Sequence, residues 1–236
     1  MKALVVVPTY NERDNLPALV PAVLRHDDVG LLIVDDGSPD GTGRAAEALA
    51  QQWPGRLRVL HRTGPRGLGR SYLEAFSQAV TEPVDLVCQM DADLSHDPSY
   101  LPALFDAAVD HDLVLGSRYL HGISVLNWPL HRIALSVFAN VYIRAITGLP
   151  VRDCTSGFRC WRRAALARLP LGRIGSDGYS FQVEMLYEAT RRGLRVAEVP
   201  IVFVERREGQ SKLSRTVLLE SIVVPWRLRF GTRRET

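Results

Sequence analysis

Short apolar runs alternate with longer segments of helical periodicity through the first half of the chain. The runs are rich in valine, leucine and isoleucine, which is typical of strands buried on both faces of a sheet. The predicted strands cover residues 2–7, 30–34, 57–61, 84–90 and 113–116, and the predicted helices cover residues 17–24, 45–52, 70–80 and 102–108. This alternation predicts an α/β fold, in which a mostly parallel sheet is flanked by helices on both faces.

Polar sequence follows three of the predicted strands: PTYNE after the first, DDGSPDG after the second and DADLSHD after the fourth. The carboxyl ends of strands in an open parallel sheet line the ligand crevice, so these endings predict a pocket for a nucleotide or a nucleotide sugar. A Rossmann dinucleotide site is disfavoured, because PTYNERDN and not a glycine fingerprint follows the first strand. The segment GPRGLG is predicted to be at most a turn near the pocket.

Two carboxylates, Asp91 and Asp93, come directly after the buried run 84–90. Charged groups at the end of a buried strand are costly unless they are solvated, paired or bound to a metal. Mg²⁺ or Mn²⁺ suits them, because a hard cation prefers oxygen ligands and leaves sites open for phosphate oxygens. The alternative is that they form turns and cap the next helix, which is the role expected of Asp97 before Pro98.

Composition narrows the class of protein. The 236 residues are enough for one large domain with a well-filled core, and neither the net charge of +3 nor any basic and aromatic stripe favours nucleic acid. Three cysteines without a CxxC pair suit a reducing compartment. No signal-peptide pattern is present, and the apolar run 133–143 falls short of the ~18 residues of a spanning helix. We therefore expect a protein that is soluble or peripheral to a membrane, and not integral.

Several motifs carry a resemblance to a known family. VVVPTYNERDNL, IVDDGSPDGT, MDADLSHDP and LGSRY resemble the inverting family 2 glycosyltransferases with the GT-A fold. NWPLHR, SGFRCWRR, GYSFQVEM and EVPIVFVERREGQSKLS are similar to the polyprenyl-phosphate mannosyltransferases, the dolichol-phosphate-mannose synthase group. The resemblance implies a GT-A, Rossmann-like catalytic domain over residues 1–215 and an amphipathic, basic C-terminal segment over residues 216–236.

The resemblance also implies a donor site. Its residues would be Pro8, Tyr10, Glu12, Val34 and Asp36 at the base and ribose, Asp91, Ala92 and Asp93 at the diphosphate, and Arg118, Arg206 and Lys212 on the acceptor side. Asp91 and Asp93 would hold Mg²⁺ or Mn²⁺, which neutralises a leaving diphosphate. Ser95 stands where relatives often carry glutamine, so it would reach the cation through water.

For the acceptor, the resemblance implies that Arg118 and Arg132 clamp a phosphate, which a guanidinium binds with two parallel hydrogen bonds. Together with Asp93 they form the predicted catalytic set. A polyprenyl phosphate is already an anionic nucleophile, so no general base is required. Arg206 and Lys212 bracket a loop implied to close over the diphosphate and the acceptor. Asp153 and the segment 156–158 are predicted to shape the acceptor floor, with Asp177 and Gln182 as candidates for contacts to the sugar.

Two later apolar stretches bear on a lipid acceptor. Residues 130–147 place apolar side chains on one helical face with arginines near both ends, and residues 216–230 mix apolar residues, Trp226 and arginines. Such sequences suit an interfacial helix on a membrane surface, and the alternative is core packing, which is at least as good a reading of the first stretch. Pro225 is expected to break any helix in the second. The resemblance implies a cytoplasmic protein that is peripheral at the cytoplasmic face of the membrane, with a separate integral membrane protein as a further candidate partner.

The leading hypothesis is therefore metal-dependent, inverting transfer of mannose from GDP-mannose to a polyprenyl monophosphate. The runner-up keeps the fold but moves glucose or another sugar from UDP to a lipid phosphate or a different acceptor. A hydroxyl acceptor would need a carboxylate base, whereas the predicted arginines and lysine favour a phosphate. A third hypothesis is a nucleotide-sugar-binding module without turnover, which the presence of both Asp91 and Asp93 disfavours.

Overall fold

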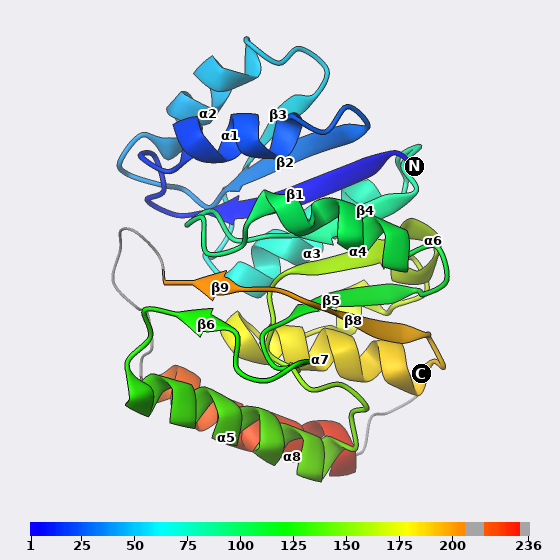
Figure 1. Ribbon diagram of the computed structural model, residues 1–236. Helices are drawn as coiled ribbons and strands as arrows, with labels where there is room; N and C mark the ends of the chain where they lie inside the picture. Colours follow the sequence, from blue (N-terminus) through cyan, green and yellow to red (C-terminus); the bar gives the residue numbers. More distant parts are fainter. Residues whose placement is uncertain (206–214, 232–236) are drawn as a thin grey trace.

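A seven-stranded sheet forms the centre of the protein, seen here in a computed structural model that describes residues 1–205 and 215–231 (Figure 1). Its strand order is β3-β2-β1-β4-β7-β5-β8. The strands are β1 (Ala3–Thr9), β2 (Val29–Asp35), β3 (Leu57–His61), β4 (Leu86–Gln89), β5 (Leu113–Ser117), β7 (Arg159–Arg162) and β8 (Val196–Pro200). Every pairing in the sheet is parallel except the two made by β7, so the predicted mostly parallel α/β sheet is confirmed.

Helices cover both faces of the sheet, as the sequence predicts. One face carries α1 (Leu16–Leu24), α2 (Thr42–Ala50) and α4 (Leu101–Ala107), the last preceded by the 3₁₀ turn η1 (Pro98–Tyr100). The other carries α3 (Leu68–Ala79), α6 (Arg163–Leu166) and α7 (Gly178–Arg191), with the 3₁₀ turn η2 (Leu171–Arg173) between the last two. Alternate strand residues feed the two cores: Val5 and Val7 pack on the first face, and Leu4 and Val6 on the second.

The antiparallel strand β7 is not anticipated by the hydrophobic pattern, because its sequence is RCWR. Arg159 is nevertheless fully buried. Its guanidinium donates to the carbonyl oxygens of Ser156 at 2.8 Å, Gln182 at 2.8 Å and Cys154 at 3.0 Å. Burial lowers the pKa of Arg159 to about 10. An arginine can enter the core here because three backbone carbonyls solvate it in place of water.

Two long helices, α5 (Leu130–Thr147) and α8 (Arg215–Phe230), lie side by side beside α7 (Figure 1). Nearby, β6 (Val125–Leu126) and β9 (Phe203–Val204) form a second, two-stranded parallel sheet. No helix among the described residues is both long and apolar enough to cross a membrane.

The expectation that Pro225 breaks the C-terminal helix is wrong, because α8 runs through it. Val224 and Leu228 are buried in the core on either side of the proline. The Tyr142 hydroxyl also donates to the carbonyl oxygen of Ile222 at 2.9 Å. The neighbouring carbonyl, of residue 221, is the one that Pro225 leaves without a helical N–H donor. Tertiary packing therefore holds the helix through a residue that would interrupt it in isolation.

Candidate active site

The ends of β1, β2 and β4 bring the predicted donor residues to one edge of the sheet. Pro8 pairs with Val34 across β1 and β2, and the backbone N–H of Asp36 donates to the Thr9 carbonyl at 3.0 Å. Tyr10 follows directly on β1. The side chain of Val34 is fully buried, so only its backbone faces this edge. The predicted base and ribose residues therefore lie on adjacent parallel strands, where a ligand crevice is expected.

The GPRGLG segment is attached to this edge more closely than the sequence suggests. The backbone N–H of Gly67 donates to Asp36 Oδ2 at 2.8 Å, and the buried guanidinium of Arg62 binds Asp36 Oδ1. Arg66 donates to the Tyr10 hydroxyl, and its guanidinium lies 4.7 Å from the centre of the Tyr10 ring. Sequence reasoning missed Arg62 and Arg66, although a loop after a parallel strand at this edge is a signal that could have found them.

Glu12 and the turn after β2 complete this side of the pocket. Glu12 Oε2 accepts from Asn15 Nδ2 at 2.7 Å, and its backbone N–H donates to Thr42 Oγ1 at 3.0 Å. Asp40 Oδ1 accepts from the backbone N–H and the hydroxyl of Thr42. Burial raises the pKa of Asp40, but the hydrogen bonds from Thr42 outweigh it and leave the pKa below its usual value. Asp40 therefore shapes the turn, while Glu12 is oriented from the strand end.

The DADLSHD segment makes a tight turn after β4. Leu94 has a φ of 60°, and the turn lets Asp93 Oδ1 accept from the backbone N–H of Ser95 at 3.1 Å and from its hydroxyl at 2.5 Å. The buried ring of His96 accepts from the backbone N–H of Asp91 at 3.1 Å and stacks on Phe158. Ala92 is buried between the two carboxylates. Asp97 caps η1 by accepting from the N–H of Ser99, as predicted.

Oxygen donors suited to a hard cation stand at this turn. Asp91 is partly exposed, whereas Asp93 and Ser95 are buried against each other. Within the described ranges, no group of three or more histidine, cysteine or acidic side chains could hold a metal ion by itself. A divalent cation here would therefore need further oxygen ligands from a bound substrate or water, as Mg²⁺ usually does.

The SGF segment joins this turn to the acceptor side. A β-carbon on Gly157 would lie 3.5 Å from Asp91 Oδ1 and 3.4 Å from His96 Cε1, so the backbone passes close to both residues. The hydroxyl of Ser156 donates to the carbonyl oxygen of Gly116 at 2.6 Å and so ties the segment to β5. Residues 156–158 therefore lie between the donor edge and the acceptor arginines.

Arg118 forms a buried ion pair with Asp153. Its Nε and Nη2 donate to the two Asp153 oxygens at 2.7 and 2.6 Å, its backbone N–H donates at 3.0 Å, and Nη2 also reaches Thr155. Burial raises the pKa of Asp153, but the charge and hydrogen bonds of Arg118 outweigh it and lower the pKa. The same pairing raises the pKa of Arg118 against the effect of burial. Nη1 of Arg118 has no hydrogen-bond partner among the described residues.

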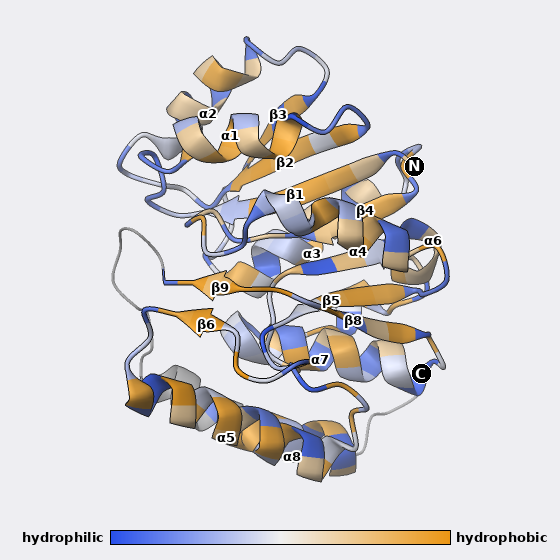
Figure 2. Cartoon of the chain, in the orientation of Figure 1, coloured by the Kyte–Doolittle hydropathy of each residue, from blue (hydrophilic) through white to orange (hydrophobic). Residues whose placement is uncertain are grey.

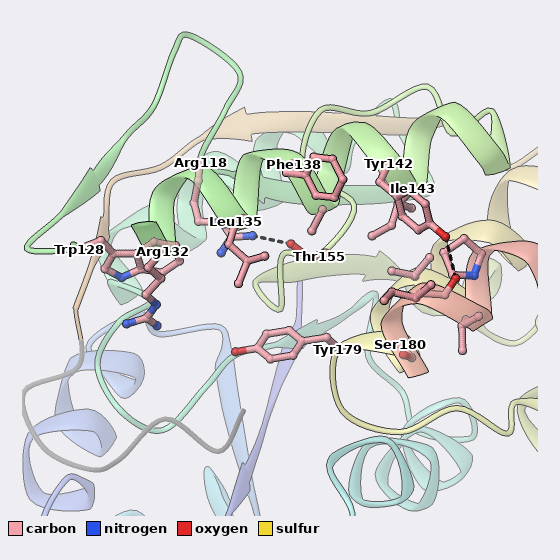
Figure 3. A pocket seen from close by; sticks show the side chains of 16 residues that line it. Arg118, Trp128, Arg132, Leu135, Phe138, Tyr142, Ile143, Thr155, Tyr179 and Ser180 are labelled. Carbon is pink, nitrogen blue, oxygen red and sulfur yellow. Dashed lines mark hydrogen bonds between the residues drawn. The ribbon is translucent and has the colours of Figure 1, made fainter. Parts of the chain in front are cut away.

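A mostly apolar groove of about 230 Å³ opens beside Arg118 (Figure 3). Arg118, Trp128 and Arg132 stand at one end of it, and Phe138 and Tyr142 lie further along α5. The remaining wall comes from the start of α7 and from α8: Tyr179, Ser180, Val183, Ile222, Val224 and Pro225. The groove thus combines a basic end with a long apolar wall.

Arg132 and its neighbours form the basic end. Its guanidinium stacks over the Trp128 ring at 4.0 Å and forms an ion pair with Glu205. Phe203 meets the Trp128 ring edge-on at 5.4 Å. The indole N–H of Trp128 is buried and has no hydrogen-bond partner in the described structure. Sequence reasoning missed Glu205, because it meets Arg132 only through the pairing of β6 with β9.

Other predicted residues are engaged in structural contacts or lie outside the described residues. Asp177 caps α7 and accepts from the backbone N–H groups of Gly69 and Gly178 at 2.6 and 2.8 Å. Gln182 is buried and accepts from Gln89 at 3.1 Å. The structure does not bring these two into the groove lining. Arg206 and Lys212 fall outside the described residues.

Residues 4–169 match the family described as Glycosyl transferase family 2. The chain belongs to this family. It is 44% identical over 232 residues to "Polyprenol monophosphomannose synthase" of Mycolicibacterium smegmatis, covering 97% of this chain and 88% of that protein. It is 42% identical over 227 residues to "Undecaprenyl-phosphate mannosyltransferase" of Micrococcus luteus, covering 94% of this chain and 92% of that protein. The resemblance seen in the motifs is thereby confirmed, and the protein is a glycosyltransferase.

Solved structures support the fold of this family 2 glycosyltransferase. The glucosyl-3-phosphoglycerate synthase of Mycobacterium tuberculosis, solved with Mn²⁺, UDP and phosphoglyceric acid, superposes with a TM-score of 0.72 at 19% identity. The match covers 99% of this chain and 80% of that one. Another structure of the same enzyme, with Mn²⁺, UDP and glucosyl-3-phosphoglycerate, gives 0.71 at 20% identity, covering 99% of this chain and 81% of that one. The GT-A-like fold expected from the motifs is therefore confirmed.

Proposed function

We propose that the protein transfers mannose from GDP-mannose to a polyprenyl monophosphate, with inversion at the anomeric carbon. Two relatives, each more than 40% identical over nearly the whole chain, are named for mannosyl transfer to polyprenol phosphates. The observation that carries the proposal is the groove, in which an apolar wall leads to two arginines. A ligand with an apolar chain and an anionic head matches both parts.

The donor occupies the edge formed by β1, β2 and β4 in this proposal. The base and ribose lie against Tyr10 and Asp36, whose carboxylate is oriented by Arg62 and the Gly67 N–H. Asp91 and Asp93 would hold Mg²⁺ or Mn²⁺, and the Ser95 hydroxyl orients Asp93 by donating to its Oδ1. When bound, the cation neutralises the charge that develops on the leaving diphosphate. Arg206 and Lys212, outside the described residues, remain proposed contacts of the diphosphate.

The acceptor enters from the other side of the SGF segment. Arg118 offers Nη1 to the acceptor phosphate while Asp153 holds its other nitrogens, and Arg132 supplies the second guanidinium. An acceptor phosphate oxygen bonds to the anomeric carbon as the bond from that carbon to the donor phosphate oxygen breaks, and GDP leaves with the electron pair. Phosphate is already charged near neutral pH, so the chain's residues orient and neutralise it and no side chain has to remove a proton.

The polyprenyl chain lies along the groove between α5 and α8. Both helices expose large apolar side chains: Leu130, Leu135, Phe138, Val141, Ile222, Val223, Trp226 and Phe230. Figure 2 shows hydrophobic residues recurring along the ribbon of α5, which lies in front of α8. Phe138 belongs both to this surface and to the groove, so a lipid could pass from a bilayer to the arginines without crossing water. We therefore propose that this face rests on a membrane surface, with Arg144 and Arg229 at anionic headgroups.

The runner-up is a UDP-linked sugar with the same acceptor. The test offers purified protein a polyprenyl phosphate with labelled GDP-mannose or UDP-glucose, each with Mg²⁺ or Mn²⁺ and with EDTA. The proposal predicts label in the organic extract from GDP-mannose alone, lost with EDTA, in a product whose anomeric configuration is inverted by NMR. Label from UDP-glucose instead would replace the donor in the proposal. Retention of configuration would contradict the displacement.

A further inference from the structure

Two arginines stand at the basic end of the groove, and each already pairs with a carboxylate. Asp153 accepts two hydrogen bonds from the Arg118 side chain and a third from the Arg118 backbone N–H. The side chain of Asp153 is 0% exposed and that of Arg118 is 8% exposed. Glu205 and Arg132 share a single ion pair, and their side chains are 30% and 20% exposed. Separating Arg118 from Asp153 would leave a buried charge without a partner, whereas the charges of Arg132 and Glu205 are partly exposed to water.

The backbone pairing of β6 with β9 places Glu205 beside Arg132. The N–H of Glu205 donates to the carbonyl oxygen of Leu126 at 3.1 Å, directly after the pairing of β6 with β9. Trp128 supports Arg132 from the β6 side, since the guanidinium stacks on its ring at 4.0 Å. Trp128 therefore fixes Arg132, while the partner carboxylate of Glu205 belongs to a partly exposed side chain.

We propose that Glu205 pairs with Arg132 while no acceptor is bound, and that the acceptor phosphate displaces Glu205 from Arg132 when it binds. The inference rests on the proposed function, because it takes a polyprenyl phosphate as the acceptor. Glu205 then acts as a specificity-determining residue. A phosphate carries more negative charge and more acceptor oxygens than a carboxylate, so it gains by the exchange. A polyprenol has a neutral head and cannot displace the carboxylate.

Charge explains why the exchange is needed. Each of the two guanidinium groups that line this end of the groove is paired with one carboxylate, Arg118 with Asp153 and Arg132 with Glu205. A phosphate arriving while Glu205 stayed on Arg132 would meet a carboxylate at close range, and like charges at that distance repel. Moving Glu205 aside leaves Arg132 to the phosphate, and no covalent bond changes.

The same competition favours release of the product. Polyprenyl-phosphate mannose is a phosphodiester with a single negative charge, whereas the acceptor monoester approaches two. Glu205 therefore competes better against the product than against the substrate. Removing its charge is expected to tighten the binding of both ligands, and that of the product more.

The test measures binding of farnesyl phosphate, with farnesol as the uncharged comparison, by titration calorimetry of the full chain in detergent. In Glu205→Gln the Kd for farnesyl phosphate is expected to fall about two- to fivefold, the range for a partly exposed ion pair. Farnesol binding should not change. In turnover, the acceptor KM and the product inhibition constant should fall while the donor KM stays constant. An unchanged or weaker Kd for farnesyl phosphate would overturn the proposal.

Two variants serve as controls. Glu82→Gln makes the same chemical change in an exposed ion pair with Arg58, remote from the groove, and should bind as the wild type does. Glu205→Asp keeps the charge and should stay close to the wild type; if it tightens binding as Gln does, charge competition is wrong. A wild type that neither binds farnesyl phosphate nor transfers mannose would refute the proposed function itself. A wild type that does both, beside a Gln variant that binds no tighter, would refute only the role of Glu205.

Discussion

The donor edge and the acceptor groove are built in opposite ways. At the donor edge, carboxylates such as Asp36 and Asp93 are oriented by backbone N–H groups, an arginine and a serine at the ends of buried strands. At the groove, arginines carry the charge, and the walls come from helices whose outer surfaces are apolar. The difference matches the two ligands: a compact polar nucleotide needs fixed hydrogen bonds, while a lipid phosphate needs cations and an apolar path.

The donor edge and the acceptor groove also differ in how much of their structure is packed against the core. Both cores contact the central sheet, so the donor edge is supported on its two faces. In α5 only Asn140, Ile143 and Thr147 are buried, so the helix presents most of its surface outward. We therefore expect substitutions at the donor edge and under the groove to have larger effects than those on the outer surface of α5 and α8.

The largest effect on activity is expected for Asp93→Asn. Removing its charge weakens the proposed cation site, so kcat should fall by about a hundredfold or more while the unfolding temperature stays constant. Asp97→Asn is the matched control on the same turn, because asparagine also caps a helix, and it should keep its activity. Wild-type rates in Asp93→Asn would remove Asp93 from the donor site.

The largest effect on stability is expected for Asp153→Asn, which leaves the buried Arg118 without its partner. The free energy of unfolding should fall by about 3 kcal/mol in chemical denaturation. The pKa of Asp153 is lowered in the folded protein, so its contribution is complete above the unfolded pKa of about 4 and is lost as the pH falls through the folded pKa. The variant should therefore lose less stability than the wild type between pH 4 and 2. An equal loss in both proteins would contradict this assignment.

A smaller, selective effect is expected for Arg132→Gln. Losing one charged hydrogen-bond donor should raise the acceptor KM about tenfold and leave the donor KM unchanged, as steady-state kinetics with each substrate varied can show. Arg191→Gln removes an exposed arginine from α7 and serves as the control. A change in the donor KM instead would contradict the proposal that the donor edge and the acceptor groove bind their ligands separately.

The smallest effect on the isolated chain is expected for the double variant Val141→Asp, Val223→Asp. Both residues are exposed and neither lines the groove, so the unfolding temperature should not fall. Flotation with vesicles that contain anionic lipid should show membrane binding reduced about tenfold. The control Val109→Asp makes the same type of substitution once, at an exposed apolar residue after α4, and is compared with each single variant as well as with the double variant. Equal losses in both variants would show that α5 and α8 are not the membrane face.

The sequence predicts the first half of the fold because most strands there are buried apolar runs, such as β1 and β2, separated by segments of helical periodicity. The run 57–61 matches β3, and the helical stretch 130–147 matches α5. The strand β7 escapes prediction because the burial of Arg159 depends on three backbone carbonyls, of residues 154, 156 and 182, that only the folded chain brings to its guanidinium. Pro225 misleads because a local rule for isolated helices ignores the packing of Val224 and Leu228.

The sequence likewise predicts one part of the candidate site and not the other. Tyr10, Asp36 and Asp91 follow strands, so strand order alone brings them together. The periodicity of residues 130–147 predicts an apolar face but not whether another element covers it; the structure leaves Phe138 and Val141 exposed, so core packing is wrong for that face. The pairing of Glu205 with Arg132 depends on two short strands far apart in the chain, and no local pattern indicates it.

The most direct test of the account is a competition for mannose. The wild type would be given labelled GDP-mannose, Mg²⁺ or Mn²⁺, and equal amounts of a polyprenyl phosphate and the polyprenol of the same length, and the lipid products would be separated. We expect label only in polyprenyl-phosphate mannose, from which mild acid releases mannose. Label in a mannoside of the polyprenol would contradict it, because the two arginines would then not be selecting a phosphate.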